Sequence, residues 1–430
     1  MRLPSTLVGL VGLAVSVFAD GNATQLGLIR KATDPQVPPA YPIGLSKEPF
    51  AKPAGQLFDI NGTVGYFAAK NAGTNAWWLG HLTKNEDVDT AMQQIANTKY
   101  KIVRVWGFGD INAGFRPSTD TADPLRVWFQ QHPASNDTEA NQAALINYSP
   151  EDGLPRLDYV VSTAERLGLK LVLPFVNNWA DLGGIATYAA AYGGSNASVS
   201  FNFFENDRAQ RAYRDYIRVL VERYRSSPAI FAWQLCNEPR CDGCDPAVIY
   251  RWAANVSAYI KQPGMDPHHM VSLGDEGWFA PDAGYREASG ASSLAYESHG
   301  GVDFWGNLNI STLDYGTFHL YPSTWGYTYS WGDRWIEQHA DAGNRAKKPV
   351  VLEEYGSPQR DDHATVLVPW QHVVLNTSIA ADQVWQFGPA NLSFDATKFG
   401  DEFSVYADKA DFANVSQKHA QAMLDKVVVL

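Results

Sequence analysis

Eight strand-like segments recur along the chain, and helix-like segments separate them. The eight are Tyr66–Asn75, Ile102–Phe108, Lys170–Asn177, Ile230–Glu238, Met270–Glu276, Tyr315–Tyr321, Pro349–Tyr355 and Gln383–Gly388. Apolar residues at helical spacing are clearest in Asp87–Thr98, Arg156–Gly168, Arg208–Ser226 and Pro246–Lys261. Strands that alternate with helices favour parallel pairing, and eight such units favour a closed barrel over an open sheet. We therefore predict an α/β fold, a (β/α)8 TIM barrel.

The first residues of the chain predict export. One basic residue, Arg2, precedes an apolar run from about Leu7 to Phe18, and small residues follow. This pattern is typical of a secretory signal peptide, here residues 1–19, and the run is shorter than the roughly 20 apolar residues that a membrane span needs. We therefore expect a secreted, extracellular protein with no membrane partner.

Potential glycosylation sites support export. The pattern N-x-S/T begins at Asn22, Asn61, Asn136, Asn147, Asn196, Asn255, Asn309, Asn376, Asn391 and Asn414. Asn147 is followed by Tyr-Ser-Pro, which can hinder its use. The net charge of −12 argues against nucleic acid as a partner, because binding to phosphates needs clustered Lys and Arg. We expect a monomer that acts on a neutral substrate.

Three segments lie outside the repeating units. The Pro-rich residues 20–57 predict an extended N-terminal leader, and residues 58–430 predict a single barrel domain. Phe58–Phe67 predicts a β-hairpin ahead of the barrel, turning at Asn61-Gly62. The polar segment Ile111–Pro150 predicts an extended loop at the C-terminal rim of the barrel, where sites in this fold are built.

Two of the predicted strands end in glutamates. The fourth ends in Asn237-Glu238, and the seventh ends in Glu354-Tyr355-Gly356. Across the mouth of a barrel the two carboxyl groups face each other, as glycoside hydrolysis requires, one protonating the leaving oxygen and the other attacking the anomeric carbon. Strand alternation places Glu354 on the inner face with Leu352 and turns Glu353 toward the helices.

Other polar residues near strand ends are candidates for the same site. Arg104 lies on the same strand face as Ile102, and its positive charge can keep one carboxylate ionised. We expect that carboxylate to be the nucleophile. The alternative for Arg104 is a buried structural salt bridge. His319 and Tyr321 close the sixth strand and share the inner face. A position at a strand end favours a functional role for this histidine over a purely structural one.

Tryptophans also lie close to the strand ends. The chain has 14 of them, and an exposed indole stacks on the apolar face of a sugar ring. Trp106 lies just inside the second strand, Trp179 just past the third, and Trp385 near the end of the eighth. We expect Trp385 to floor a sugar site, while core packing is the alternative for each of these residues.

Seven motifs carry a resemblance to a known family. In chain order they are RVWGF, LVLPFVNNWADLGG, AWQLCNEPRCDGC, GDEGW, FHLYP, VLEEYG and VWQFG. Together they resemble the fungal endo-β-1,4-mannanases of glycoside hydrolase family 5, over about Gly73 to Gly388. NEP alone marks only the wider clan of retaining barrel hydrolases, whereas NEPRCDGC with FVNNW and EEYG is more specific.

The resemblance implies a retaining hydrolase of β-mannan that needs no metal or organic cofactor. It implies that Glu238 is the general acid/base and Glu354 the nucleophile, with carboxyl groups ~5–5.5 Å apart. It further implies that Asn237 holds the 2-hydroxyl of the reacting sugar and that Arg240 reaches the leaving-group side. The resemblance also implies that the nucleophile is surrounded by Arg104, His319 and Tyr321. It implies that the cleft is lined by Trp106, Trp179 and Trp385.

Three alternatives remain beside this expectation. An endo-β-1,4-glucanase or an exo-acting β-mannosidase would use the same barrel and the same glutamates, since mannose and glucose differ at one hydroxyl. A non-catalytic carbohydrate-binding barrel belongs to a different class of protein, but a pure binder has no need of paired carboxylates.

The three cysteines, Cys236, Cys241 and Cys244, lie within nine residues of one another. A zinc site lacks a fourth ligand nearby, and nothing in the sequence suggests a thioredoxin-like redox unit. In an oxidising compartment we expect a local Cys241–Cys244 disulfide, which the resemblance also implies. Cys236 is then left as a small buried thiol.

The chain departs from the family pattern at two positions. The family usually has Glu where this chain has Gln234, and Gly or Ala where it has Cys236. Loss of a buried acid removes a charge that would raise the pKa of the acid/base. We therefore expect an altered pH optimum.

Overall fold

The structure, a computed structural model, describes residues 28–60, 67–69, 71–115, 118–120, 123, 126–134, 143–193, 198–288 and 293–429. The predicted signal peptide and the sequons at Asn22, Asn61, Asn136 and Asn196 lie outside these ranges. Among the helices so described, none is long and apolar enough to cross a membrane.

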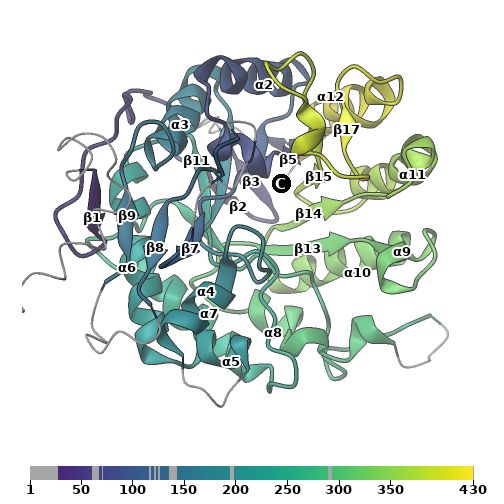
Figure 1. Cartoon of the computed structure of the whole chain (residues 1–430). Helices are drawn as coiled ribbons and strands as arrows, with labels where there is room; N and C mark the ends of the chain where they lie inside the picture. The colour runs from purple at the N-terminus through teal and green to yellow at the C-terminus, as the bar shows by residue number, and fades with distance from the viewer. Residues whose placement is uncertain are drawn as a thin grey trace, which may run out of the picture.

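Eight parallel strands form the predicted barrel (Figure 1). In order around the sheet they are β12 (Met270–Ser272), β11 (Ile230–Gln234), β10 (Lys170–Pro174), β6 (Ile102–Arg104), β5 (Asn71–Asn75), β15 (Ala381–Val384), β14 (Val350–Tyr355) and β13 (Gly316–Leu320). Backbone hydrogen bonds from Asp314 N to Val271 O (2.8 Å) and from His319 N to Glu276 O (3.1 Å) connect the two ends of the sheet. The predicted (β/α)8 barrel is confirmed.

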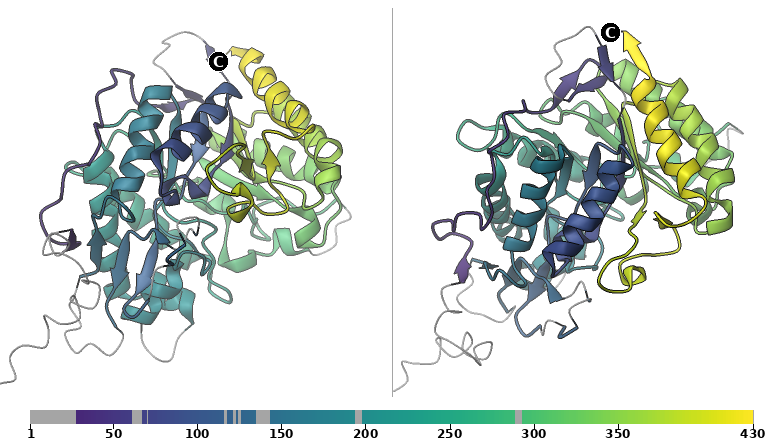
Figure 2. Two further views of the ribbon diagram at one scale, coloured as in Figure 1. Left: turned by 45° about the horizontal axis from the view of Figure 1, so that its top comes forward. Right: turned by 90° about the horizontal axis from the view of Figure 1, so that it is seen from above.

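Helices surround the barrel and cover its outer face (Figures 1 and 2). They are α2 (Asn85–Asn97), α3 (Pro155–Leu167), α4 (Gly184–Tyr192), α5 (Val199–Phe204), α6 (Asp207–Tyr224), α7 (Ala247–Lys261), α8 (Phe304–Leu308), α9 (Pro322–Trp325), α10 (Trp331–Ala346), α11 (His363–Asn376) and α12 (Lys418–Asp425). In α6, the Asn206 side chain caps the first turn, accepting hydrogen bonds from the backbone of Arg208 (2.9 Å) and Ala209 (3.1 Å). Tyr213 and Ile217 on its apolar face are fully buried.

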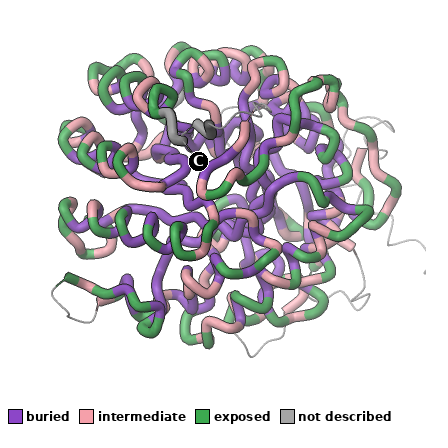
Figure 3. The backbone as a smooth tube through the Cα atoms, turned by 180° about the vertical axis from the view of Figure 1, so that it is seen from behind, coloured by how far each residue is buried: buried purple, intermediate pink, exposed green. Residues whose placement is uncertain are grey.

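The side chains inside the barrel change from apolar to polar along the strands. The residues of these strands are buried, as the purple colour in Figure 3 shows. The lower layer includes Ile102, Val172, Ala232, Met270, Val351 and Ala381. Leu57 and Phe58 of the hairpin β2 (Lys52–Ala54) and β3 (Leu57–Asp59) pack against this layer. Two residues further along several strands, the inward position is polar, as at Arg104, Gln234 and Glu353. This polar layer lies toward the C-terminal opening of the barrel.

The predicted hairpin over Phe58–Phe67 is wrong in its pairing. Phe58 pairs with Pro53, whereas Phe67 in β4 (Phe67–Ala69) pairs with Val429 of the C-terminal β18 (Val427–Val429). The predicted turn at Asn61-Gly62 lies outside the described residues. The predicted first strand is therefore divided, and only Asn71–Asn75 enters the barrel, because β4 contributes its hydrogen bonds to the chain end instead. The predicted boundary between residues 57 and 58 falls within β3 and stays a prediction.

The polar insertion after β6 folds in part as a small sheet. Its strands are β7 (Asp110–Asn112), β8 (Gln130–His132) and β9 (Leu145–Asn147). β7 pairs with β8, β8 pairs with β9, and β9 pairs with β1 (Ile29–Lys31) from the leader. The leader is thus partly strand, because its backbone completes the edge of this sheet. The eighth predicted strand also ends early: β16 (Phe387–Gly388) pairs outside the barrel with β17 (Val405–Tyr406).

One described sequon is unsuited to glycosylation. Asn147 is buried, and its side-chain amide donates to the carbonyl oxygens of Trp128 (3.2 Å) and Asp152 (3.1 Å). A glycan on that nitrogen would break these bonds. The other described sequons begin at exposed residues, which are Asn255, Asn309, Asn376, Asn391 and Asn414.

Candidate active site

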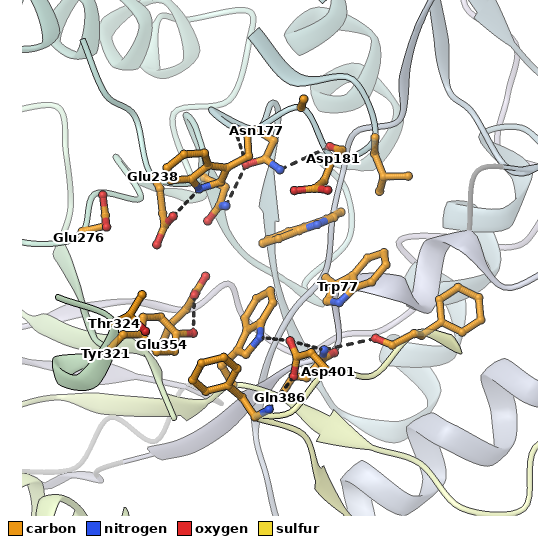
Figure 4. Close-up of a pocket in the computed structure, with 18 of the residues that line it drawn as sticks. Trp77, Asn177, Asp181, Glu238, Glu276, Tyr321, Thr324, Glu354, Gln386 and Asp401 are labelled. Atoms are coloured by element: carbon orange, nitrogen blue, oxygen red, sulfur yellow. Dashed lines mark hydrogen bonds between the residues drawn. The ribbon is translucent and has the colours of Figure 1, made fainter. Parts of the chain in front are cut away.

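A cleft of about 1130 Å³ opens at the C-terminal ends of the barrel strands (Figure 4). Most of the predicted site residues line it, namely Trp106, Trp179, Asn237, Glu238, Arg240, Tyr321, Glu354 and Trp385. Arg104 and His319 are fully buried and contact the two glutamates from below the cleft. The structure therefore brings all of the predicted polar site residues together.

Glu238 follows β11, and both of its carboxylate oxygens accept hydrogen bonds. His319 Nδ1 lies 2.7 Å from Oε1, and Trp179 Nε1 donates to Oε2. The backbone of Glu238 is left-handed, with φ of +50°, and its N–H donates to Gly274 O (2.9 Å). Such a conformation costs a non-glycine residue roughly 1–2 kcal/mol, so the surrounding hydrogen bonds must hold it.

Glu354 lies opposite, on β14. The Tyr321 hydroxyl donates to its Oε2 (2.8 Å), and Arg104 forms a buried ion pair with its Oε1. A carboxylate oxygen of Glu354 and one of Glu238 lie within 4.8 Å of each other. This separation resembles that of retaining glycosidases, since inverting enzymes hold the two groups about 6.5–9.5 Å apart to admit a water.

The predicted orientation of Glu353 is wrong. Its carboxylate points into the barrel, where Oε1 accepts a hydrogen bond from the Gln234 amide (2.7 Å) and Oε2 lies 3.4 Å from Arg104 Nε. The inner-layer residue Val351 lies two positions before Glu353, so alternation turns Glu353 inward and Leu352 outward. A bulge follows, where Phe318 pairs with Leu352 and the next residue, His319, pairs with Glu354. The extra residue turns Glu354 inward as well, so Glu353 and Glu354 both face the site.

Arg104 connects the residues of the polar layer. Besides Glu354, its guanidinium donates to side-chain oxygens of Asn75 (3.2 Å), Gln234 (2.8 Å) and Asn237 (2.6 Å). The predicted salt bridge and the predicted role beside Glu354 thus coexist. His319 differs from the prediction, because its shortest carboxylate contact is with Glu238, while its Nδ1 lies 3.6 Å from Glu354.

Protonation in the site is shared among coupled groups. Burial alone would lower the pKa of His319, but the carboxylates of Glu354, Glu238 and Glu353 raise it to about 10. Burial opposes ionisation of Glu238, yet the hydrogen bonds from His319 and Trp179, together with the charges of His319 and Arg240, outweigh burial and lower its pKa to about 2. Both pKa shifts reflect a single proton that His319 Nδ1 and Glu238 Oε1 share across the 2.7 Å between them. Burial, reinforced by the charge of Glu238, raises the pKa of Glu354 against the opposing effects of His319 and Arg104.

The side of the cleft next to Glu238 carries a second ion pair. Arg240 donates to both oxygens of Glu276, with Nε 2.6 Å from Oε2, and its guanidinium lies 4.9 Å from the centre of the Trp179 ring. Burial and the charge of Glu238 raise the pKa of Glu276 to about 7. The sequence reasoning missed Glu276 as a site residue, although it ends the fifth predicted strand in the motif GDEGW.

The other side of the cleft is aromatic. Trp106 and Trp385 lie with ring centres 5.8 Å apart, and Trp385 Nε1 donates to Asp401 Oδ2 (2.8 Å). Trp77 and Asp401 also line this part of the cleft (Figure 4). Sequence reasoning missed these two residues. Asp401 lies in a segment with no strand-end signal. Trp77 lies two residues past the end of β5 and could have been found by the rule used for Trp179.

One group of described side chains has ligand atoms close enough to hold a metal ion. Glu238, His319 and Glu354 place one such atom each within 4.8 Å of the others. However, Arg104 already supplies a buried positive charge to Glu354, and His319 bonds to Glu238. The arrangement therefore fits acid–base chemistry, and the predicted lack of a cofactor stays a prediction.

The predicted disulfide between Cys241 and Cys244 is present, and Cys236 is a buried free thiol. Cys241 N donates to Gly300 O (2.7 Å), and Arg240 N donates to Asn178 Oδ1 (3.3 Å). Backbone hydrogen bonds at Arg240 and at Cys241 thus hold the loop that carries the disulfide.

The side chain of Gln234 lies between a hydrogen-bond donor and a hydrogen-bond acceptor, and its amide group bonds to both. Its oxygen accepts from Arg104 (2.8 Å), and its nitrogen donates to Glu353 (2.7 Å) and Ser272 (3.2 Å). A second carboxyl at this position would add buried negative charge below the His319–Glu238 pair.

We expect Gln234→Glu to move the basic limb of the pH dependence of kcat/KM to higher pH, by roughly 0.5–1 unit, because added negative charge favours the protonated pair. The neutral variant Gln234→Met, which alters packing without adding charge, is the control. An unchanged profile in Gln234→Glu would contradict the expectation.

Comparisons with known proteins agree with this geometry. The profile described as "GH family 5 beta-mannosidase-like" matches residues 140–386. The mannan endo-1,4-beta-mannosidase A of Aspergillus aculeatus is 43% identical over 375 residues, which cover 87% of this chain and 90% of the relative. The enzyme of the same name from Hypocrea jecorina is 42% identical over 375 residues, covering 87% of this chain and 78% of the relative.

Solved structures give the same result for the fold. The endo-1,4-beta-mannanase from Rhizomucor miehei superposes with a TM-score of 0.74 at 30% identity, covering 88% of this chain and 100% of that protein. The endo-beta-1,4-mannanase from Thermotoga petrophila has a TM-score of 0.70 at 29% identity, covering 83% of this chain and 77% of that protein.

Proposed function

The chain belongs to glycoside hydrolase family 5, in its β-mannosidase-like group, and on this premise we propose that it is a retaining endo-1,4-β-mannosidase. Its substrates would be β-mannans, including galactomannans and glucomannans. The observation that carries the proposal is the Glu238–Glu354 pair, whose oxygens lie within 4.8 Å across an aromatic cleft. The relatives named as mannan endo-1,4-beta-mannosidases support the choice of mannan over glucan.

In the proposed mechanism each glutamate acts in two steps, and the short distance between the two carboxylates supports it. In the first step Glu354 attacks the anomeric carbon while the Glu238 side chain protonates the departing oxygen. In the second step Glu238 takes a proton from water, whose oxygen attacks the same carbon and releases Glu354. Arg104 and Tyr321 stabilise the charge of Glu354 between the steps.

The remaining predicted residues act on the substrate chain. Asn237 is held by Arg104 and Asn177, which fixes its amide beside the glutamates for a sugar hydroxyl. Arg240 and Trp179 lie on the leaving-group side, and Trp179 is 40% exposed and free to stack on a sugar. Trp106 is only 4% exposed, so it supports Trp385 more than it contacts substrate.

Endo action follows from the position of the pair within the cleft. Glu276 and Trp77 lie on opposite sides of Glu238 and Glu354 (Figure 4). Lining residues on both sides leave room for sugars before and after the bond that breaks. Export of the enzyme is supported by the predicted signal peptide and by the exposed sequons.

The test is a digest of linear mannan and of a soluble cellulose derivative by wild-type protein beside Glu354→Ala. We expect short manno-oligosaccharides from the wild type alone. Mannose as the first product would indicate exo action, and activity on cellulose alone would move the specificity to glucan. Binding to either polymer without hydrolysis would overturn the proposal in favour of a carbohydrate-binding barrel.

A further inference from the structure

A third carboxylate lies beneath the two glutamates of the proposed reaction. Glu353 is 1% exposed and reaches the barrel interior two residues after the inner-layer residue Val351. Its Oε1 accepts the Gln234 amide, while its Oε2 lies 3.6 Å from His319 Nε2 and 3.4 Å from Arg104 Nε. Neither Glu353 Oε2 nor His319 Nε2 has a hydrogen-bond partner among the described residues. The two atoms therefore face each other as an ion pair, at a distance longer than a hydrogen bond.

The His319 ring lies between two carboxylates. Its Nδ1 is 2.7 Å from Glu238 Oε1, and its Nε2 faces Glu353 Oε2. A carboxylate is only an acceptor, so the nitrogen that faces Glu353 keeps its hydrogen. The exchangeable proton is then the one on Nδ1, which points at Glu238. Glu353 thus selects the tautomer of the ring.

Other charged groups surround the ring from each neighbouring element. Glu354 on β14 lies 3.6 Å from Nδ1, Asp275 and Glu276 follow β12, and Arg104 projects from β6. Tyr321 on the same segment as His319 bonds to Glu354. Of the ion pairs that His319 makes with described residues, the one with Glu353 is formed through Nε2 and those with Glu238 and Glu354 through Nδ1.

We propose that Glu353 is a positioning residue of the hydrolase: it holds His319 charged and oriented, so that the His319–Glu238 pair retains the proton that Glu238 gives to the leaving oxygen. This inference rests on the proposed function. When Glu238 protonates the glycosidic oxygen, the C–O bond breaks, Glu354 bonds to carbon, and Nδ1 passes its proton to Glu238. Water later returns one proton to the pair and its oxygen to the sugar, so the pair regains its starting state.

The test is the isosteric variant Glu353→Gln, which removes the charge but keeps the shape. We expect the basic limb of the kcat/KM profile to move at least about one unit to lower pH, an approximately tenfold loss at a fixed pH on that limb. A role in packing alone would lower kcat or Tm without moving the limb, and that result would overturn the proposal.

Asp275→Asn is the matched control. It removes another buried carboxyl near the site, from a side chain that bonds to Asn307. The charge of His319 acts on Asp275, but among the described residues the two side chains do not form an ion pair. We expect a smaller shift of the basic limb from this variant. An equal shift would show that buried charge in general, and not the position of Glu353, controls the pair.

A second readout needs no substrate. The imidazole signals of His319, identified by their loss in His319→Gln, are titrated by NMR in wild type, Glu353→Gln and Glu353→Asp. We expect the midpoint to fall by at least about one unit in Glu353→Gln, with Glu353→Asp in between. If Glu353→Gln does not fold, Glu353→Asp alone decides, and an unchanged midpoint overturns the proposal. Inactivity of the wild type on mannan would refute the proposed function but leave this titration decisive.

Discussion

Glu354→Ala will remove almost all hydrolysis of β-mannan, with kcat lower by roughly 10⁴–10⁶-fold. The reason is that the two carboxylates beside it are already engaged by other groups. Glu353 is bonded to Gln234 and lies next to Arg104 beneath the cleft, and Glu238 is bonded to His319 and Trp179. The rate is measured by release of reducing ends from linear mannan, with the Tm of the variant compared with that of the wild type.

The control for Glu354→Ala is rescue by a small nucleophile. Azide fits the space of the missing carboxylate and attacks an activated aryl β-mannoside from the α face, so the expected product is an α-mannosyl azide. A β-configured product, or undiminished hydrolysis, would show that Glu354 is not the nucleophile.

Glu238→Ala will lower kcat/KM on mannan by roughly 10³–10⁴-fold, because the departing sugar oxygen needs a proton. The loss will depend on the leaving group. A dinitrophenolate departs without protonation, so cleavage of a dinitrophenyl β-mannoside should show a much smaller effect on the first step. Both substrates are measured by steady-state and burst kinetics.

Azide again provides the control for Glu238→Ala. With Glu354 intact, azide attacks the glycosyl–enzyme from the β face, and we expect a β-mannosyl azide. Equal losses for mannan and the dinitrophenyl substrate would assign Glu238 a role other than proton transfer.

The barrel was predictable because its pattern is local. Each strand buried on both faces requires an apolar run, such as Lys170–Pro174, which is buried throughout. Polar residues at the ends of such runs identified Glu238, His319 and Glu354, since parallel strands bring their C-terminal ends to one rim. The errors fell on segments whose pairing partner lies far along the chain. Phe67 pairs with Val429, and Ile29 pairs with Asn147.

Glu353 and Glu354 show where the alternation rule fails. Alternation counted from Glu354 turned Glu353 outward, whereas Glu353 is inward by alternation from Val351, and the bulge between β13 and β14 turns Glu354 inward beside it. No residue in VLEEYG marks that bulge, because it arises from the register of two neighbouring strands and not from local propensity. Asp401 was missed for a related reason, since a loop brings it into the cleft, whereas Glu276 ends the fifth predicted strand and the strand-end rule could have found it.

The barrel, the two opposed glutamates and the neighbouring arginine, histidine and tyrosine were predictable from the amino-acid sequence, because strand periodicity and strand ends fix which residues reach the rim. How these groups share charge follows from the folded structure. His319 pairs with Glu238 and Glu353 reaches beneath the ring because strand register, set by hydrogen bonds between distant segments, fixes those distances. Proton sharing varies steeply with such distances, so the acid–base chemistry of this site belongs to the folded barrel.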